Sequence, residues 1–139
     1  MGLTDIKDAI DIVLAEDDPE DVEIFKMALE TVGSQVRIRH VPNGDRLMDL
    51  LEQSIPDILF LDMHMPCKDG LACISEIRQQ PKYDTMPIVM YTTQQYRKLI
   101  EEKNKQTANY YIDKPDSINE LVEQLQQLLV VLKLIVQPK

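Results

Sequence analysis

Short apolar runs alternate along the chain with longer stretches in which apolar residues recur at helical spacing. The runs are too short for helices, and residues 58–61 form one without polar interruption, as in a strand buried on both faces. Residues 36–39 instead alternate Val36 and Ile38 with two arginines, which predicts an edge strand with one solvated face. The pattern predicts strands over 10–15, 36–39, 58–61, 87–91 and 109–113.

Each apolar run is followed by a stretch with helix signals. After the first, Asp18 offers an N-cap, Pro19 suits the first helical position, and Gly33 is a natural stop. Glu20 and Asp21 suit the positive end of the helix dipole, which alone accounts for acids there. The later helices carry Leu47, Leu50 and Leu51, then Leu71, Ile74 and Ile77, then Tyr96, Leu99 and Ile100, and Ser117 with Glu120 forms a capping box for the last.

Strand and helix alternate five times, which implies a parallel sheet with helices on both faces. In open sheets of this class, functional sites form outside the carboxyl ends of the strands. Four predicted strands end in residues that can carry chemistry. They are Glu16, Asp17 and Asp18 after the first strand, Asp62 after the third, Thr92 and Thr93 after the fourth, and Lys114 after the fifth.

Composition narrows the class of protein. The chain has 139 residues, 44% of them hydrophobic, which is enough for the core of one domain. The net charge of −9 speaks against direct DNA binding. No run approaches the roughly 18 apolar residues of a membrane span, and no secretion signal opens the chain. We expect one cytoplasmic domain over 1–139 without membrane association, its core at about 9–129 and an extension of the last helix at about 130–137.

The acids at the strand ends favour a particular chemistry. Carboxylates that converge on one crevice repel one another unless a cation offsets their charge. Oxygen ligands without a histidine–cysteine set favour a hard cation, and we expect Mg²⁺. A lysine at position 114 and a hydroxyl at Thr92 would suit a phosphoryl group that adds to a carboxylate.

These features together resemble the receiver domains of two-component response regulators. The resemblance covers about residues 10–129 and rests on Glu16-Asp17, Asp62, Met65-Pro66 with Asp69-Gly70, Thr92, and Lys114-Pro115. It implies an α/β, three-layer, flavodoxin-like fold of five strand–helix units. The five-stranded parallel sheet would have the order 2-1-3-4-5.

The resemblance also implies roles for the acidic residues. Asp62 matches the family's phospho-acceptor, and Asp17 matches a direct Mg²⁺ ligand. Glu16 matches the neighbouring acidic position, which often reaches the metal through water. The backbone carbonyl of His64 matches the third protein ligand of Mg²⁺, beside Asp17 and Asp62.

Three further residues match the family's switch. Thr92 matches the hydroxyl that bonds a phosphoryl oxygen, and Lys114 matches the lysine that pairs with the phosphoryl group. Tyr111 matches the aromatic residue whose rotamer follows the shift of Thr92, although core packing explains a tyrosine there equally well. The output face would comprise the fourth helix, the fifth strand and the fifth helix.

The expected function is that of a phosphorelay response regulator, in a chain too short for an attached output domain. A histidine kinase or phosphotransfer protein would phosphorylate Asp62, and the switch would then bind an unknown downstream protein. The apolar last helix also suggests a homodimer through the output face. The expected protein is a switch that assists its own phosphorylation and dephosphorylation, not a turnover enzyme.

Three alternatives remain open at this point. A phosphatase of the haloacid-dehalogenase type would also use an aspartate nucleophile, but such enzymes usually carry an aspartate two residues later, where this chain has His64. A flavodoxin-like cofactor binder would share the sheet order, but the acidic first loop of this chain would repel the phosphate of a flavin. The third alternative is a receiver-like module that binds partners without phosphorylation.

Overall fold

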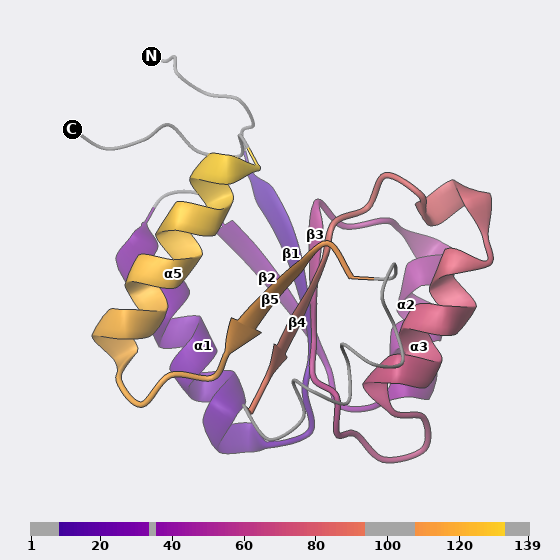
Figure 1. Cartoon of the computed structure of the whole chain (residues 1–139), viewed down its shortest axis with the longest axis horizontal. Helices are drawn as coiled ribbons and strands as arrows, with labels where there is room; N and C mark the ends of the chain where they lie inside the picture. Colours follow the sequence, from indigo (N-terminus) through magenta and orange to yellow (C-terminus); the bar gives the residue numbers. More distant parts are fainter. Residues whose placement is uncertain (1–8, 34–35, 94–107, 133–139) are drawn as a thin grey trace.

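The five predicted strands form one parallel sheet in the computed structural model, which describes residues 9–33, 36–93 and 108–132. The strands are β1 (Ile10–Ala15), β2 (Val36–Val41), β3 (Ile58–Leu61), β4 (Ile88–Thr92) and β5 (Tyr110–Asp113). Their order is β2-β1-β3-β4-β5, as the resemblance implied, so the expected fold class is confirmed. β2 and β5 are the two edges of the sheet (Figure 1).

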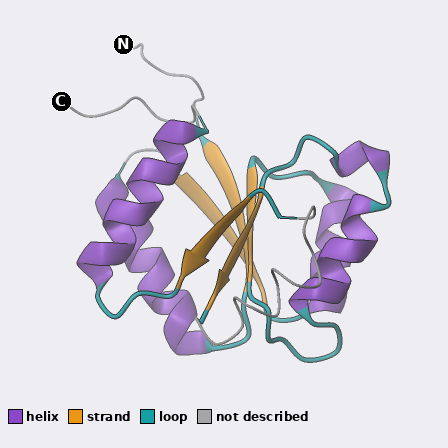
Figure 2. Cartoon of the chain, in the orientation of Figure 1, coloured by secondary structure: helices purple, strands orange, loops and turns teal. Residues whose placement is uncertain are grey.

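Helices cover both faces of the sheet (Figure 2). They are α1 (Pro19–Val32), α2 (Gly44–Gln53), α3 (Gly70–Arg78) and α5 (Ile118–Val131), with a 3-10 turn at Pro81–Tyr83. α1 and α5 lie on one face and α2 and α3 on the other. The predicted helix with Tyr96, Leu99 and Ile100 lies outside the described residues. Residues 133–137, which make up most of the predicted extension of the last helix, also lie outside the described residues.

Side chains of the inner strands alternate between two apolar clusters, one under each helical layer. Val13 and Leu59 join the cluster under α2 and α3, whereas Leu14 and Phe60 join the cluster under α1 and α5. Phe25 of α1 is fully buried and meets the ring of Phe60 edge-on, with centroids 4.9 Å apart. This packing fixes α1, and with it the loop that joins β1 to α1.

The predicted helix starts are confirmed by their caps. The side chain of Asp18 accepts the backbone N–H of Glu20 at 2.9 Å, and Ser117 accepts that of Glu120 at 3.1 Å. Gly33 ends α1 with a φ of 94°, a conformation that favours glycine.

Within the described ranges, no helix combines the length and apolarity that crossing a membrane requires.

A polar clamp joins the edge strand β2 to the rest of the sheet. Arg39 donates to both carboxylate oxygens of Asp11, at 3.0 and 2.7 Å, and to the hydroxyl of Ser54 at 2.7 Å. The clamp therefore links β1, β2 and the end of α2. Both charged side chains are partly buried, where such forked pairs are stronger than exposed ones.

We predict that Asp11→Ala destabilises the protein by about 1–3 kcal/mol, because it leaves a partly buried guanidinium without its forked acceptor. Equilibrium unfolding in urea, followed by circular dichroism, measures the change. Asp49→Ala is the control, because Asp49 is an exposed aspartate on α2. Equal stability of the two variants would contradict a stabilising role for the clamp.

Candidate functional site

Backbone hydrogen bonds continue past three strand ends and fix three of the predicted site residues. The N–H of Glu16 donates to the carbonyl of Val41 at 3.0 Å, and the N–H of Asp62 to that of Ala15 at 3.0 Å. The N–H of Lys114 donates to the carbonyl of Thr92 at 2.9 Å. The parallel ladder thereby brings residues from distant parts of the sequence to one edge of the sheet, the one formed by the carboxyl ends of the strands.

Gly70 lets α3 begin directly against the end of β3. A Cβ atom at this position would overlap the carbonyl oxygen of Asp62 and lie 2.9 Å from the Cα of Met63. The N–H of Gly70 donates to the carbonyl of Met63 at 2.8 Å, which closes the loop between β3 and α3. The backbone of Asp62 is therefore held by the strand ladder on one side and by the start of α3 on the other.

Three carboxylates converge at this edge. Glu16, Asp17 and Asp62 each offer an oxygen, and these oxygens all lie within 4.8 Å of one another. Glu16 and Asp62 are buried, and Asp17 is exposed at the mouth of the group. The donor set consists of oxygen alone and carries negative charge, which fits a hard divalent cation such as Mg²⁺.

The ammonium group of Lys114 lies among the acids. Its Nζ is 2.8 Å from an oxygen of Glu16, 2.8 Å from an oxygen of Asp21 and 3.6 Å from an oxygen of Asp62. The side chain is only 12% exposed. Burial opposes the charge on Lys114, but hydrogen bonds to Asp21 and Glu16 outweigh it and raise the pKa, so the lysine stays protonated.

Burial has the opposite consequence for Glu16. It raises the pKa of this carboxyl well above the usual range, and the neighbouring charge of Asp62 adds to the rise. Lys114 opposes the shift without cancelling it. The charged form of Glu16 is therefore disfavoured in this pocket, and a divalent cation would stabilise it.

Two buried oxygens in the pocket have unused capacity for hydrogen bonds. Oδ1 of Asp62 and the hydroxyl of Thr92 find no hydrogen-bond partner among the residues that the structure describes. Unsatisfied buried oxygens are costly, and their presence in a pocket points to a ligand. The pocket encloses about 480 Å³ and is lined by Glu16, Asp17, Asp18, Pro19, Asp21, Asp62, His64, Thr92, Thr93 and Lys114.

The sequence-predicted site residues therefore meet in one place, with one exception. Glu16, Asp17, Asp62, Thr92 and Lys114 all line the pocket. His64 also lines it, with an exposed side chain in the loop two residues after Asp62.

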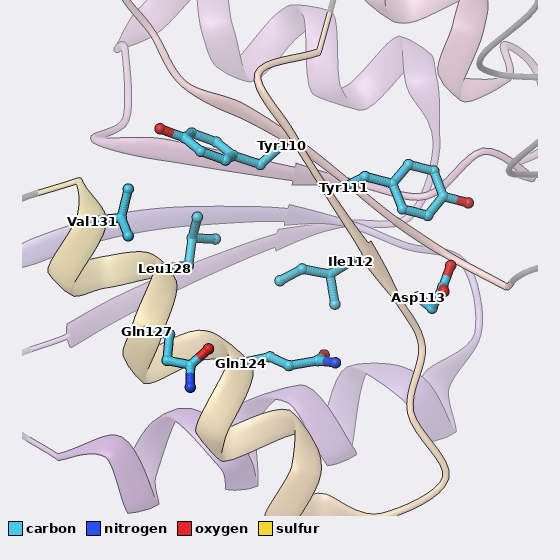
Figure 3. A pocket seen from close by; sticks show the side chains of 8 residues that line it. All are labelled: Tyr110, Tyr111, Ile112, Asp113, Gln124, Gln127, Leu128 and Val131. Carbon is cyan, nitrogen blue, oxygen red and sulfur yellow. The ribbon is translucent and has the colours of Figure 1, made fainter.

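Tyr111 is the exception, because it lies outside this pocket. It lines a separate groove of about 380 Å³ between β5 and α5, which Figure 3 shows. Its half-buried ring packs against the cluster under α2 and α3. Tyr110, its neighbour, points to the other side of the strand, toward α5 (Figure 3).

One charged residue of the pocket, Asp21, was not predicted as part of the site, because its place in the first turn of a helix suggests a role at the helix dipole alone. In the structure its carboxylate accepts a hydrogen bond from Lys114 at 2.8 Å. Its spacing could have identified it. Asp21 precedes the buried Phe25 by four residues, so it continues the inward-facing stripe of α1 as a charged residue.

Comparisons with known proteins agree with this geometry. The family model of the response regulator receiver domain matches residues 12–126. An uncharacterized 14.6 kDa protein in the sodA1 3' region of Leptolyngbya boryana is 32% identical over 123 residues, which cover 85% of this chain and 88% of that protein. The transcriptional regulatory protein CpxR of Escherichia coli K12 is 32% identical over 118 residues, which cover 85% of this chain. They cover only 48% of CpxR, so the chain spans about half the length of that relative.

Solved structures point the same way. The crystal structure of the phosphorylated cyanobacterial phytochrome response regulator RcpA superposes with a TM-score of 0.77 at 26% identity. The match covers 87% of this chain and 91% of that one. The strand order, the acidic edge of the sheet and the family match over most of the sequence lead to one conclusion: this chain belongs to the family of response regulator receiver domains, which serve two-component signalling.

Proposed function

We propose that this protein is a phosphorylation switch whose phospho-acceptor is Asp62. The observation that carries the proposal is a pair of buried oxygens, on Asp62 and Thr92, that have no hydrogen-bond partner within the described residues; the pocket also holds the Lys114 ammonium. A phosphoryl group on Asp62 would offer oxygens to both the hydroxyl and the ammonium. The pocket thus has a nucleophile and two hydrogen-bond donors for the group that the nucleophile would accept.

The donor would be a phosphohistidine of a histidine kinase or phosphotransfer protein. A carboxylate oxygen of Asp62 attacks phosphorus in line, a P–O bond forms and the P–N bond to the imidazole breaks. The leaving imidazole keeps the bonding electron pair and takes up a proton. The fixed backbone of Asp62 aims the nucleophile, and Lys114 compensates the charge of the product.

Asp17, Asp62 and the backbone carbonyl of His64 would hold Mg²⁺, with Glu16 reaching it through water. The all-oxygen group of carboxylates within 4.8 Å and the raised pKa of Glu16 support this assignment. The cation would neutralise charge that develops on the phosphoryl oxygens. Lys114 then needs to supply only part of the compensating charge.

The signal would leave through the β5–α5 side of the protein. Thr92 ends β4 and is paired with Asp113 of β5, so a shift of its hydroxyl toward a phosphoryl group acts on the strand that carries Tyr111. We propose that Tyr111 follows this shift and that β5 passes the change to the groove of Figure 3, where a downstream protein would bind. Members of this family are signalling switches rather than turnover enzymes.

The same groove favours a homodimer. Val131 of α5 is 60% exposed, and with Tyr110, Ile112 and Leu128 it forms the apolar part of the lining, beside the polar Asp113, Gln124 and Gln127. A two-fold axis would let one such surface cover its copy. Within the described residues β5 is the last strand of the sheet order, so it lies beside this groove at the side of the sheet.

The family match bears on two of the three alternatives that the sequence left open, and an experiment decides the third. The family match favours neither a haloacid-dehalogenase phosphatase nor a cofactor binder. A receiver that works without phosphorylation differs from our proposal only in the chemistry of Asp62. The first experiment below therefore decides between these two.

Incubation with Mg²⁺ and acetyl phosphate should give an acid-stable, base-labile acyl phosphate, which intact-mass spectrometry detects. We predict that Asp62→Asn lowers the yield below detection, because an amide is a poor nucleophile. Asp84→Asn is the control, since Asp84 is exposed at the opposite end of the sheet. Full labelling of Asp62→Asn would falsify the assignment of the acceptor, and an unlabelled wild-type protein would favour the phosphorylation-independent module.

Mg²⁺ should raise the melting temperature of the wild-type protein, because it binds the folded state alone. We predict that Asp17→Ala weakens Mg²⁺ binding about tenfold or more, since even outer-shell partners of a metal cost that much. The shift of the melting temperature with Mg²⁺ concentration gives the affinity. Glu23→Gln, an exposed acid on α1, is the control and should behave as wild type. An unchanged affinity in Asp17→Ala would remove this residue from the metal site.

Light scattering at micromolar concentration tests the dimer. We predict a dimer for the wild-type chain and a monomer for Val131→Asp, because a carboxylate at this position would lose its hydration when two copies associate. Ile55→Asp is the matched control, since Ile55 is 48% exposed but lies away from this groove. A monomeric wild-type protein would end the dimer hypothesis and leave the groove to another partner.

A further inference from the structure

The partners of Lys114 are unequal. The two carboxylate oxygens nearest its ammonium belong to Glu16 and Asp21, each 2.8 Å away. The oxygen of Asp62 lies at 3.6 Å, beyond the range of a hydrogen bond. The lysine that should meet a phosphoryl group on Asp62 is therefore held mainly by two other acids.

Neither the proposed metal site nor the helix dipole explains the contact with Asp21. Asp21 is absent from the group of oxygens within 4.8 Å of one another, which contains Glu16, Asp17 and Asp62. Glu20 serves the dipole equally well from an exposed position in the same turn of α1. Asp21 is instead only 29% exposed and directed at the lysine, and α1 starts at the end of the sheet to which the strand arrows point (Figure 1).

We propose that Asp21 is a positioning residue that holds Lys114 back from Asp62 and so opposes capture of the lysine by the phosphoryl group. This inference rests on the function proposed above. A phosphoryl group on Asp62 increases the negative charge on that side of the ammonium. To bond it, Nζ must move toward Asp62 and loosen its contact with Asp21.

The burial of Lys114 makes this competition strong. With the side chain only 12% exposed, water does not replace a partner that the ammonium gives up. The carboxylate of Asp21 therefore stabilises the unphosphorylated arrangement at the expense of the phosphorylated one. Removing its charge should release the lysine toward Asp62.

Beryllofluoride, which mimics a phosphoryl group on a carboxylate, tests the inference. Its affinity is measured by calorimetry at an Mg²⁺ concentration that saturates each variant, so that metal binding does not enter the comparison. We expect Asp21→Asn to bind beryllofluoride about three- to tenfold more tightly than wild type, the effect of losing one competing ion pair. Asp21→Glu, which keeps the carboxylate, should return toward the wild-type affinity.

Glu20→Gln is the matched control. It removes the same charge from the same turn, but Glu20 is exposed and is not among the acids that hold Lys114. We expect its affinity to stay within about twofold of wild type, the effect of one exposed charge. Equal tightening in Glu20→Gln and Asp21→Asn would overturn the inference, because overall charge would then be the cause.

A second measurement uses the protein without Mg²⁺ or beryllofluoride. The ammonium resonance of Lys114, observed by NMR, should shift in Asp21→Asn and return in Asp21→Glu. A resonance unmoved by Asp21→Asn would overturn the inference, as would unchanged or weaker beryllofluoride binding in this variant. Failure of the wild-type protein to bind beryllofluoride would instead overturn the proposed function, and the inference with it.

Discussion

The charge of one buried ammonium group holds this site together. Glu16, Asp21 and Asp62 all approach this ammonium, and without it their negative charges would repel one another. Lys114 compensates all three from the end of β5, where a backbone bond to Thr92 fixes it. Burial raises the pKa of Glu16 despite this lysine, so the charged form of Glu16 would gain from a divalent cation.

The parallel sheet is the reason that these groups meet at all. Asp62 and Lys114 stand far apart in the sequence, yet each follows a strand that ends at the same edge. The ladder continues past each strand end by one hydrogen bond, so the backbone of each residue is fixed before its side chain makes any contact. Gly70 adds a constraint from the other side, since only a residue without Cβ lets α3 start against Asp62. The backbone of Asp62 is therefore held from both sides.

The sequence predicted the strands, the helix starts and the pocket residues at the strand ends because these follow from local rules. Periodicity separates buried from exposed positions, and caps and glycines mark helix ends. The clamp of Arg39 on Asp11 and the bond of Lys114 to Asp21 depend instead on which elements pack together, and no local signal specifies such pairs. The position of Asp21 on the inward stripe of α1 was visible, but its partner was not. The role of Tyr111 stays a prediction, because its ring lies outside the pocket.

β5 connects the two ends of the proposed switch. Lys114 follows the strand directly, and Tyr110, Tyr111 and Asp113 within it line the groove beside α5 (Figure 3). The strand has only four residues, and among the described strands it is paired with β4 alone. A displacement of Lys114 from Asp21 toward Asp62 would pull on the end of this strand, and a short edge strand resists such a pull less than an inner one. In the proposed switch, the ion pair with Asp21 and the shape of the groove would therefore be coupled through the same four residues.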